Sequence, residues 1–104
     1  MPIKRIVRGT ITPETERLLR ELVAEWKNPS DDTSNPVILQ EGGGKRPVHV
    51  YVVWEEWAGL DQLERSEIIL EAFEEVKGKK AALEVTVAMG LTAREAERMG
   101  ISYK

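Results

Sequence analysis

The sequence predicts one small α+β domain in which helices pack on one face of a mixed β-sheet. Its 104 residues suit a single domain, since compact domains cluster around roughly 100–150 residues. Short runs rich in β-branched residues also alternate along the chain with segments whose apolar residues recur at helical spacing. The predicted order over residues 1–104 is therefore strand, helix, strand, strand, helix, strand and short helix.

The first strand and helix are predicted in the N-terminal quarter. Residues 3–8 alternate basic and β-branched side chains, which is typical of an edge strand and leaves homodimerisation through that strand open. Thr12 and Pro13 then give an N-cap followed by proline at the first helical position. Apolar residues follow at helical spacing, namely Leu18, Leu19, Leu22, Val23 and Trp26. The polar segment 28–36 predicts a flexible exposed loop.

A β-hairpin is predicted in the middle of the chain. Residues 37–41 and 47–54 are strand-like, and segment 42–46, Gly-Gly-Gly-Lys-Arg, is the expected tip. Because strand side chains alternate between faces, one face of the second strand should be the core side. The core-side residues would be Val48, Val50, Val52 and Trp54, and the opposite face would carry His49, Tyr51 and Val53.

The remaining elements follow from caps and periodicity. Asp61 and Glu64 form a capping-box pattern that opens a helix ending at Lys77 and Gly78. Its apolar positions are Ile68, Ile69, Ala72, Phe73 and Val76. Residues 83–89 alternate and predict a strand whose Glu84 and Thr86 would share a face with His49 and Tyr51. Thr92 with Glu95 caps a final short helix that stops at Gly100.

Composition limits the possible functions. The net charge of −3 and the pI near 5.3 provide no overall positive field for nucleic acid or anionic membranes. The absence of cysteine excludes disulfides and Cys-ligated metals in this chain. No apolar run approaches the roughly 20 residues that a membrane helix needs, so a soluble cytoplasmic protein is expected. Charged residues make up 32%, a composition typical of thermophiles.

No catalytic, cofactor-binding or metal-binding set is evident. His49 is the only histidine, and its neighbours offer neither a nucleophile nor a carboxylate. Segment 42–46 is not a Walker loop, because Arg46 leads into a strand rather than a helix. Two alternatives remain open: acidic residues 55, 56 and 61 as paired carboxylates of an enzyme, and a helix-turn-helix over residues 85–99.

Five residues are the candidate contacts for a partner or nucleic acid: Lys45, Arg46, His49, Tyr51 and Trp57. The two adjacent cations follow three glycines and could receive an acidic group. His49 and Tyr51 would lie on an open sheet platform of the kind that stacks bases. Trp26 and Trp54 are expected in the core, whereas Trp57 precedes Ala58 and Gly59 and is expected to be partly exposed.

Three motifs stand out within residues 44–95: the strand HVYVVW at 49–54, WAGLD at 57–61 with Glu64 and Arg65, and LTARE at 91–95. Through these motifs, residues 44–95 resemble the BolA family. The resemblance implies a KH-like domain of helix, strand, strand, helix, strand and short helix, and cluster sharing with a monothiol glutaredoxin. Ser66 and Glu84 occupy the two positions where the family has histidines. The Gly-x-x-Gly clamp of RNA-binding KH domains is absent.

These observations predict a non-enzymatic binding module that contacts a protein partner. The first alternative is a nucleic-acid-binding KH-like domain that uses segment 42–46, the open sheet face and the basic residues of segment 3–8. The second alternative is a small enzyme, which requires a concave site with convergent polar groups.

Overall fold

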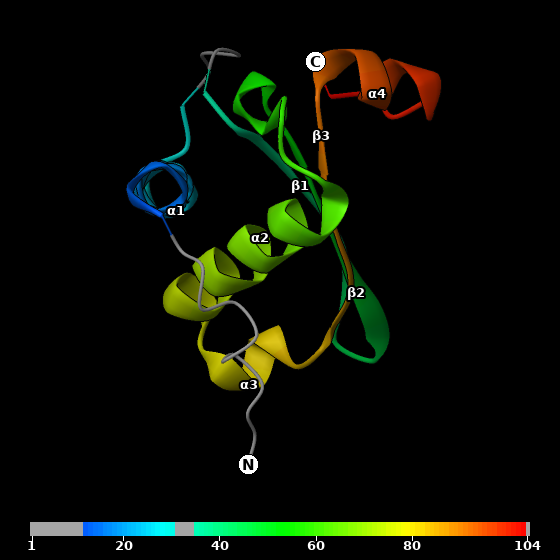
Figure 1. Ribbon diagram of the computed structural model, residues 1–104. Coiled ribbons are helices and arrows are strands. Elements are labelled where there is room, and N and C mark those ends of the chain that lie inside the picture. Colours follow the sequence, from blue (N-terminus) through cyan, green and yellow to red (C-terminus); the bar gives the residue numbers. More distant parts are fainter. Residues whose placement is uncertain (1–11, 31–34, 104) are drawn as a thin grey trace.

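The structure is a computed structural model and describes residues 12–30 and 35–103 (Figure 1). The predicted strand 3–8 lies outside the described residues. The elements are α1 (Pro13–Lys27), β1 (Val37–Gly43), β2 (Arg46–Val53), the 3₁₀ helix η2 (Glu55–Trp57), α2 (Gln62–Lys77), α3 (Lys79–Ala82), β3 (Val85–Leu91) and α4 (Ala93–Arg98). This α+β architecture with a mixed sheet confirms the predicted fold class.

The sheet of the described residues has the order β1-β2-β3. β1 and β2 are antiparallel, whereas β3 runs parallel to β2 because the chain crosses over through α2. α1 and α2 pack together on one face of the sheet (Figure 1). The buried core between them includes Leu18, Leu22, Val50, Val52, Trp54, Trp57, Ile69 and Phe73. No helix of the described part of the chain is long and apolar enough to cross a bilayer.

The three predicted helix starts are each fixed by a complete capping box. In α2, Glu64 N donates to Asp61 Oδ1 at 2.8 Å, and Asp61 N donates to Glu64 Oε1 at 3.1 Å. Thr12 with Thr15 and Thr92 with Glu95 make the same reciprocal bonds at α1 and α4. Each box satisfies two backbone N–H groups that a helix leaves unpaired at its start.

The hairpin turn is tighter than the five-residue tip expected at 42–46. β1 continues to Gly43 and β2 begins at Arg46, so only Gly44 and Lys45 lie in the turn. Gly44 has a φ of +63°, and Lys45 is not among the described residues with a positive φ, as a type II′ turn requires. A Cβ on Gly42 would lie 1.9 Å from the Pro47 carbonyl oxygen, so only glycine fits there.

The alternation predicted for residues 83–89 is wrong in register. β3 starts two residues later than expected, since Leu83 is an exposed residue that caps α3. Val85 pairs with Val48 but Val87 pairs with His49, so Thr86 is one extra residue on β3. This bulge inverts the alternation beyond it. Val87 and Met89, rather than Glu84 and Thr86, therefore share a face with His49 and Tyr51.

A second, smaller apolar cluster lies at one end of the opposite sheet face. Val53, Leu91 and Ala96 are buried there, with Ile101 and Tyr103 packed against them. Leu91 and Ala96 flank the capping box of α4, and Ile101 N donates to the carbonyl of Ala96 at 2.9 Å. α4 covers this end of the sheet on the side away from α1 and α2 (Figure 1).

Candidate functional site

Side chains from three strands form the part of the sheet face opposite α1 and α2 that lies beside the second apolar cluster. We call it the open sheet face, and it consists of Leu39, Glu41, His49, Tyr51, Val87 and Met89. Leu39 and Met89 also pack against that cluster. Glu41 is exposed and the other five are half-buried. The rings of His49 and Tyr51 lie edge to face with centroids 6.4 Å apart. The open sheet face therefore combines two aromatic rings with three aliphatic or thioether side chains.

His49 has one acidic neighbour on this face. Its Nδ1 lies 3.8 Å from Glu41 Oε1 on the paired strand, and the two side chains are 36% and 71% exposed. Such an exposed pair adds little stability because water screens it. Among the described residues, no group of three His, Cys, Asp or Glu side chains is placed to hold a metal ion.

Lys45 and Arg46 lie at the end of the β1-β2 hairpin, and both are exposed. Lys45 is the second residue of the two-residue turn, and Arg46 is the first residue of β2. The tight turn fixes the backbone that carries these two cations. His49 and Tyr51 follow on the same strand, so four of the five predicted contact residues belong to the β1-β2 hairpin.

The prediction that Trp57 is partly exposed is wrong, because its side chain is completely buried. Its Nε1 donates to the Val52 carbonyl at 3.0 Å, and its ring lies edge to face against Trp54 with centroids 5.2 Å apart. The short helix η2 turns the chain back after β2 and directs the indole into the core. Trp57 is therefore not available to a partner. Trp54 is buried as predicted, while Trp26 is half-buried against Phe73.

Arg65 is a buried cation that joins three parts of the fold. Its side chain is only 7% exposed. Nε donates to the Leu60 carbonyl at 2.9 Å, and NH1 donates to the Gly90 carbonyl at 3.0 Å and to Glu95 Oε1 at 2.8 Å. A buried guanidinium is stable only when its donors are satisfied in this way. Arg65 thus holds the turn before α2, the end of β3 and the cap of α4 together.

Glu95 makes folding stability depend on acidic pH. The Thr92 backbone N–H and the Arg65 guanidinium lower the pKa of Glu95 below its ordinary value of 4.5. The stabilisation is therefore fully present above about pH 4.5 and is lost as pH falls through the lower folded-state pKa. The free energy of unfolding, measured with urea between pH 7 and pH 3, should therefore fall toward acidic pH. In Glu95→Gln this fall should be smaller. An unchanged pH dependence would contradict the assignment. Glu75, whose pKa is lowered by Arg20, accounts for a further part.

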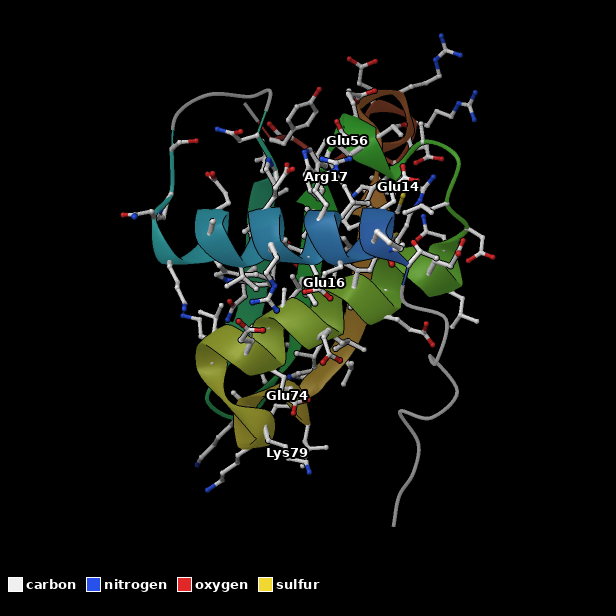
Figure 2. The ribbon with its side chains drawn as sticks, turned by 60° about the vertical axis from the view of Figure 1, so that its left-hand side comes forward. Glu14, Glu16, Arg17, Glu56, Glu74 and Lys79 are labelled. Carbon is white, nitrogen blue, oxygen red and sulfur yellow. The ribbon has the colours of Figure 1, made fainter. Side chains whose placement is uncertain are left out.

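The acidic residues proposed as an enzyme's paired carboxylates have separate structural contacts. Glu56 accepts from Arg17 NH2 at 3.1 Å, as the two labelled side chains in Figure 2 illustrate. Glu55 accepts from the Ala93 backbone N–H at 2.6 Å, and Asp61 caps α2. The helix-turn-helix alternative is overturned, because residues 85–91 are strand β3 and α4 spans only Ala93–Arg98.

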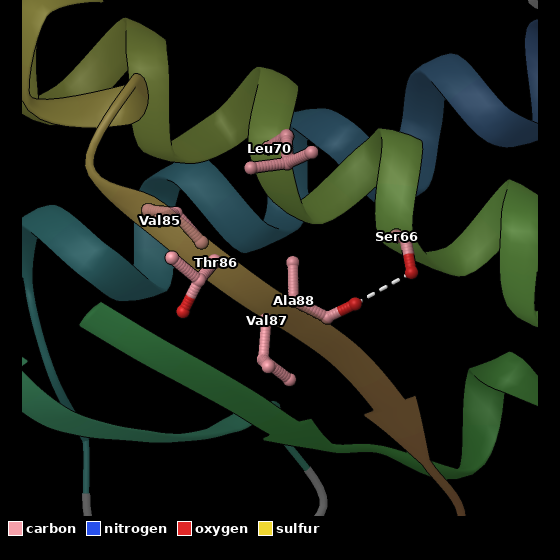
Figure 3. A pocket seen from close by; sticks show the side chains of 6 residues that line it. All are labelled: Ser66, Leu70, Val85, Thr86, Val87 and Ala88. Atoms are coloured by element: carbon pink, nitrogen blue, oxygen red, sulfur yellow. Dashed lines mark hydrogen bonds between the residues drawn. The ribbon is translucent and has the colours of Figure 1, made fainter. Parts of the chain in front are cut away.

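A groove of about 350 Å³ runs between α2 and β3 (Figure 3). Its lining consists of Ser66, Leu70, Val85, Thr86, Val87 and Ala88. The hydroxyl of Ser66 donates to the Ala88 carbonyl at 2.5 Å. Ser66 lines this groove, and Glu84 directly precedes its lining residue Val85. The sequence pattern did not identify the groove, because it forms only where the strand edge meets the side of a helix.

The candidate surfaces are thus the open sheet face with its hairpin tip and the groove between α2 and β3. In comparisons with known proteins, no family model, no curated protein and no solved structure matches this chain.

Proposed function

We propose that this protein is a non-enzymatic, cytoplasmic binding module that contacts a protein partner through the open sheet face and the hairpin tip. The observation that supports this most is the bulge at Thr86, which brings Val87 and Met89 beside His49 and Tyr51. Aromatic residues, methionine and arginine are enriched at protein interfaces, and Arg46 is exposed at the start of the strand that carries His49 and Tyr51. The two cations at the tip would form a polar rim that selects an acidic partner surface.

Reversing the charge of the hairpin tip is expected to abolish partner capture. In affinity capture from the native source, the variant Lys45→Glu/Arg46→Glu should lose a protein that the unaltered chain retains. The two glutamates that replace the exposed cations would repel an acidic surface. Tyr51→Ala should weaken the same capture without touching the charge. Arg94→Glu/Arg98→Glu is the matched control, since it makes the same charge change on exposed residues of α4. Equal capture by all variants would contradict the proposal.

A nucleic-acid function is the second candidate, supported by the ring pair of His49 and Tyr51 beside two cations. Such a surface could stack unpaired bases while Lys45 and Arg46 contact phosphates. Binding to single-stranded RNA or DNA should then weaken steeply with rising salt. Weak, salt-independent binding in a fluorescence anisotropy titration would exclude this candidate and leave the protein-partner proposal standing.

We also propose a distant relation to the BolA family and its KH-like fold. Two observations support it: the described elements follow the order implied by the resemblance, and three of the resembling residues, Trp57, Arg65 and Glu95, lie around Gly90. Cluster sharing is not part of this proposal, because Ser66 and Glu84 stand at the histidine positions.

A further inference from the structure

β3 forms one edge of the described sheet, and α2 covers only half of that edge. Toward the end of β3, side chains of α2 donate to carbonyls that point outward. Ser66 Oγ donates to Ala88, and Gln62 Nε2 donates to Gly90 at 2.6 Å. Arg65 donates to Gly90 as well. This half of the edge is therefore closed to pairing with another strand.

The first half of the same edge is accessible. Val48 N donates to the Glu84 carbonyl at 3.3 Å, and Val48 is paired with Val85. In a parallel ladder, the residue opposite such a donor, here Val85, points its own N–H and C=O away from the neighbouring strand. The Val85 backbone therefore faces the groove, whereas Gln62, Arg65 and Ser66 donate to the carbonyls of Ala88 and Gly90 further along β3. Leu70 on α2 forms the apolar wall opposite.

The surroundings of the groove are apolar and acidic. Leu63 precedes Ser66 by one helical turn and is 66% exposed, and Leu83 precedes the start of β3 and is 80% exposed. Glu67 follows Ser66 on α2, and Glu84 directly precedes Val85. Within residues 12–30 and 35–103, neither of these two carboxylates forms an ion pair with a cationic side chain. Each of these two carboxylates is thus next in sequence to a residue that lines the groove, Glu67 to Ser66 and Glu84 to Val85.

We propose that this groove binds an extended peptide segment of a partner protein that carries an apolar residue flanked by basic residues. The peptide backbone adds a short strand to the open half of β3, which is the β-augmentation mode of recognition. Its apolar side chain enters the space under Leu70, and its basic residues approach Glu67 and Glu84. Of the residues that line this groove, only Val87 also belongs to the open sheet face. Variants that leave Val87 unchanged can therefore test the two sites independently.

The test uses the full chain and a defined probe, the fluorescein-labelled heptapeptide Lys-Val-Lys-Leu-Lys-Val-Lys with both ends blocked. Fluorescence anisotropy should show binding that Leu70→Arg weakens at least about tenfold, because it fills the groove and repels the probe. Glu67→Lys/Glu84→Lys should weaken it similarly. Lys45→Glu/Arg46→Glu, which alters only the hairpin tip, should leave it unchanged. Circular dichroism of each variant verifies that the fold is retained.

A chemically modified probe tests strand addition itself without altering the protein. The same heptapeptide with its alternate backbone nitrogens methylated keeps all charges and side chains but loses hydrogen-bond donors on one edge. Of the two possible methylation patterns, at least one should abolish binding. If both methylated probes bound as tightly as the unmodified probe, strand addition would be overturned and only charge attraction would remain. Absence of binding by the unmodified probe at millimolar concentration would overturn the proposal, as would a dimer of this chain that Leu70→Arg dissociates.

Discussion

Replacing Trp57 with alanine is expected to lower the free energy of unfolding by about 3–5 kcal/mol, the range for deleting a large buried aromatic side chain. The indole is fully buried, and its removal also leaves the Val52 carbonyl without its 3.0 Å donor. Because small domains have only about 5–15 kcal/mol of total stability, the fraction of unfolded molecules at room temperature should rise markedly. Urea denaturation followed by tryptophan fluorescence and circular dichroism measures the loss.

Trp26→Ala is the matched control for this prediction. It removes the same side chain from α1, where the ring is only half-buried against Phe73. We expect it to lose clearly less stability than Trp57→Ala, since less apolar surface becomes exposed to water. If Trp57→Ala kept full stability and instead lost partner capture, the indole would be a contact residue and its buried position would be wrong.

Replacing Arg65 with methionine is expected to lower the free energy of unfolding by about 2–4 kcal/mol. Loss of one member of a buried charged pair is costly because its partners remain unsatisfied. The Leu60 carbonyl and Glu95 lose a donor, whereas the Gly90 carbonyl keeps its bond from Gln62. Methionine retains much of the apolar stem, so the measured loss reports mainly on the guanidinium. Chemical denaturation of Arg65→Met against the unaltered chain measures it.

A double-mutant cycle separates the ion pair from the other contacts of Arg65. Glu95→Gln and Arg65→Met should be non-additive, with a coupling energy on the order of 1 kcal/mol, because NH1 and Oε1 are 2.8 Å apart and Arg65 is buried while Glu95 is 38% exposed. Additive losses would mean that the bonds to the Leu60 and Gly90 carbonyls carry the whole effect. Arg65→Lys should recover only part of the free energy of unfolding that Arg65→Met loses, since a lysine ammonium lacks the planar set of donors that a guanidinium has.

Local sequence signals were sufficient for α1, α2 and α4, whereas the short helices η2 and α3 were not predicted. The boundaries of α1, α2 and α4 follow from cap residues such as Asp61 and Thr92 and from proline at the first position of α1. These signals act within one helical turn, so a single sequence contains all the information they need. The hairpin was equally accessible, because glycine at a position with positive φ is required by the turn itself.

Features that depend on contacts between distant segments were not accessible in this way. Nothing near Trp57 in the sequence indicates that its indole reaches Gly90, where a Cβ would approach the ring to 2.9 Å. The role of Arg65 was equally hidden in the sequence, since its acceptors on Gly90 and Glu95 lie 25 and 30 residues away. The register of β3 failed for a related reason: alternation along one strand cannot reveal an extra residue that only the pairing with β2 defines.

The extra residue in β3 also decides where this strand tolerates a change in length. Val85 and Val87 face consecutive residues of β2, Val48 and His49, so a chain lacking Thr86 would have a regular ladder with every later side chain on its present face. Deletion of Ala88 or Met89 would instead shift the residues beyond the gap to the wrong face. Thr86 is thus the position in β3 at which a one-codon deletion should leave a folded protein.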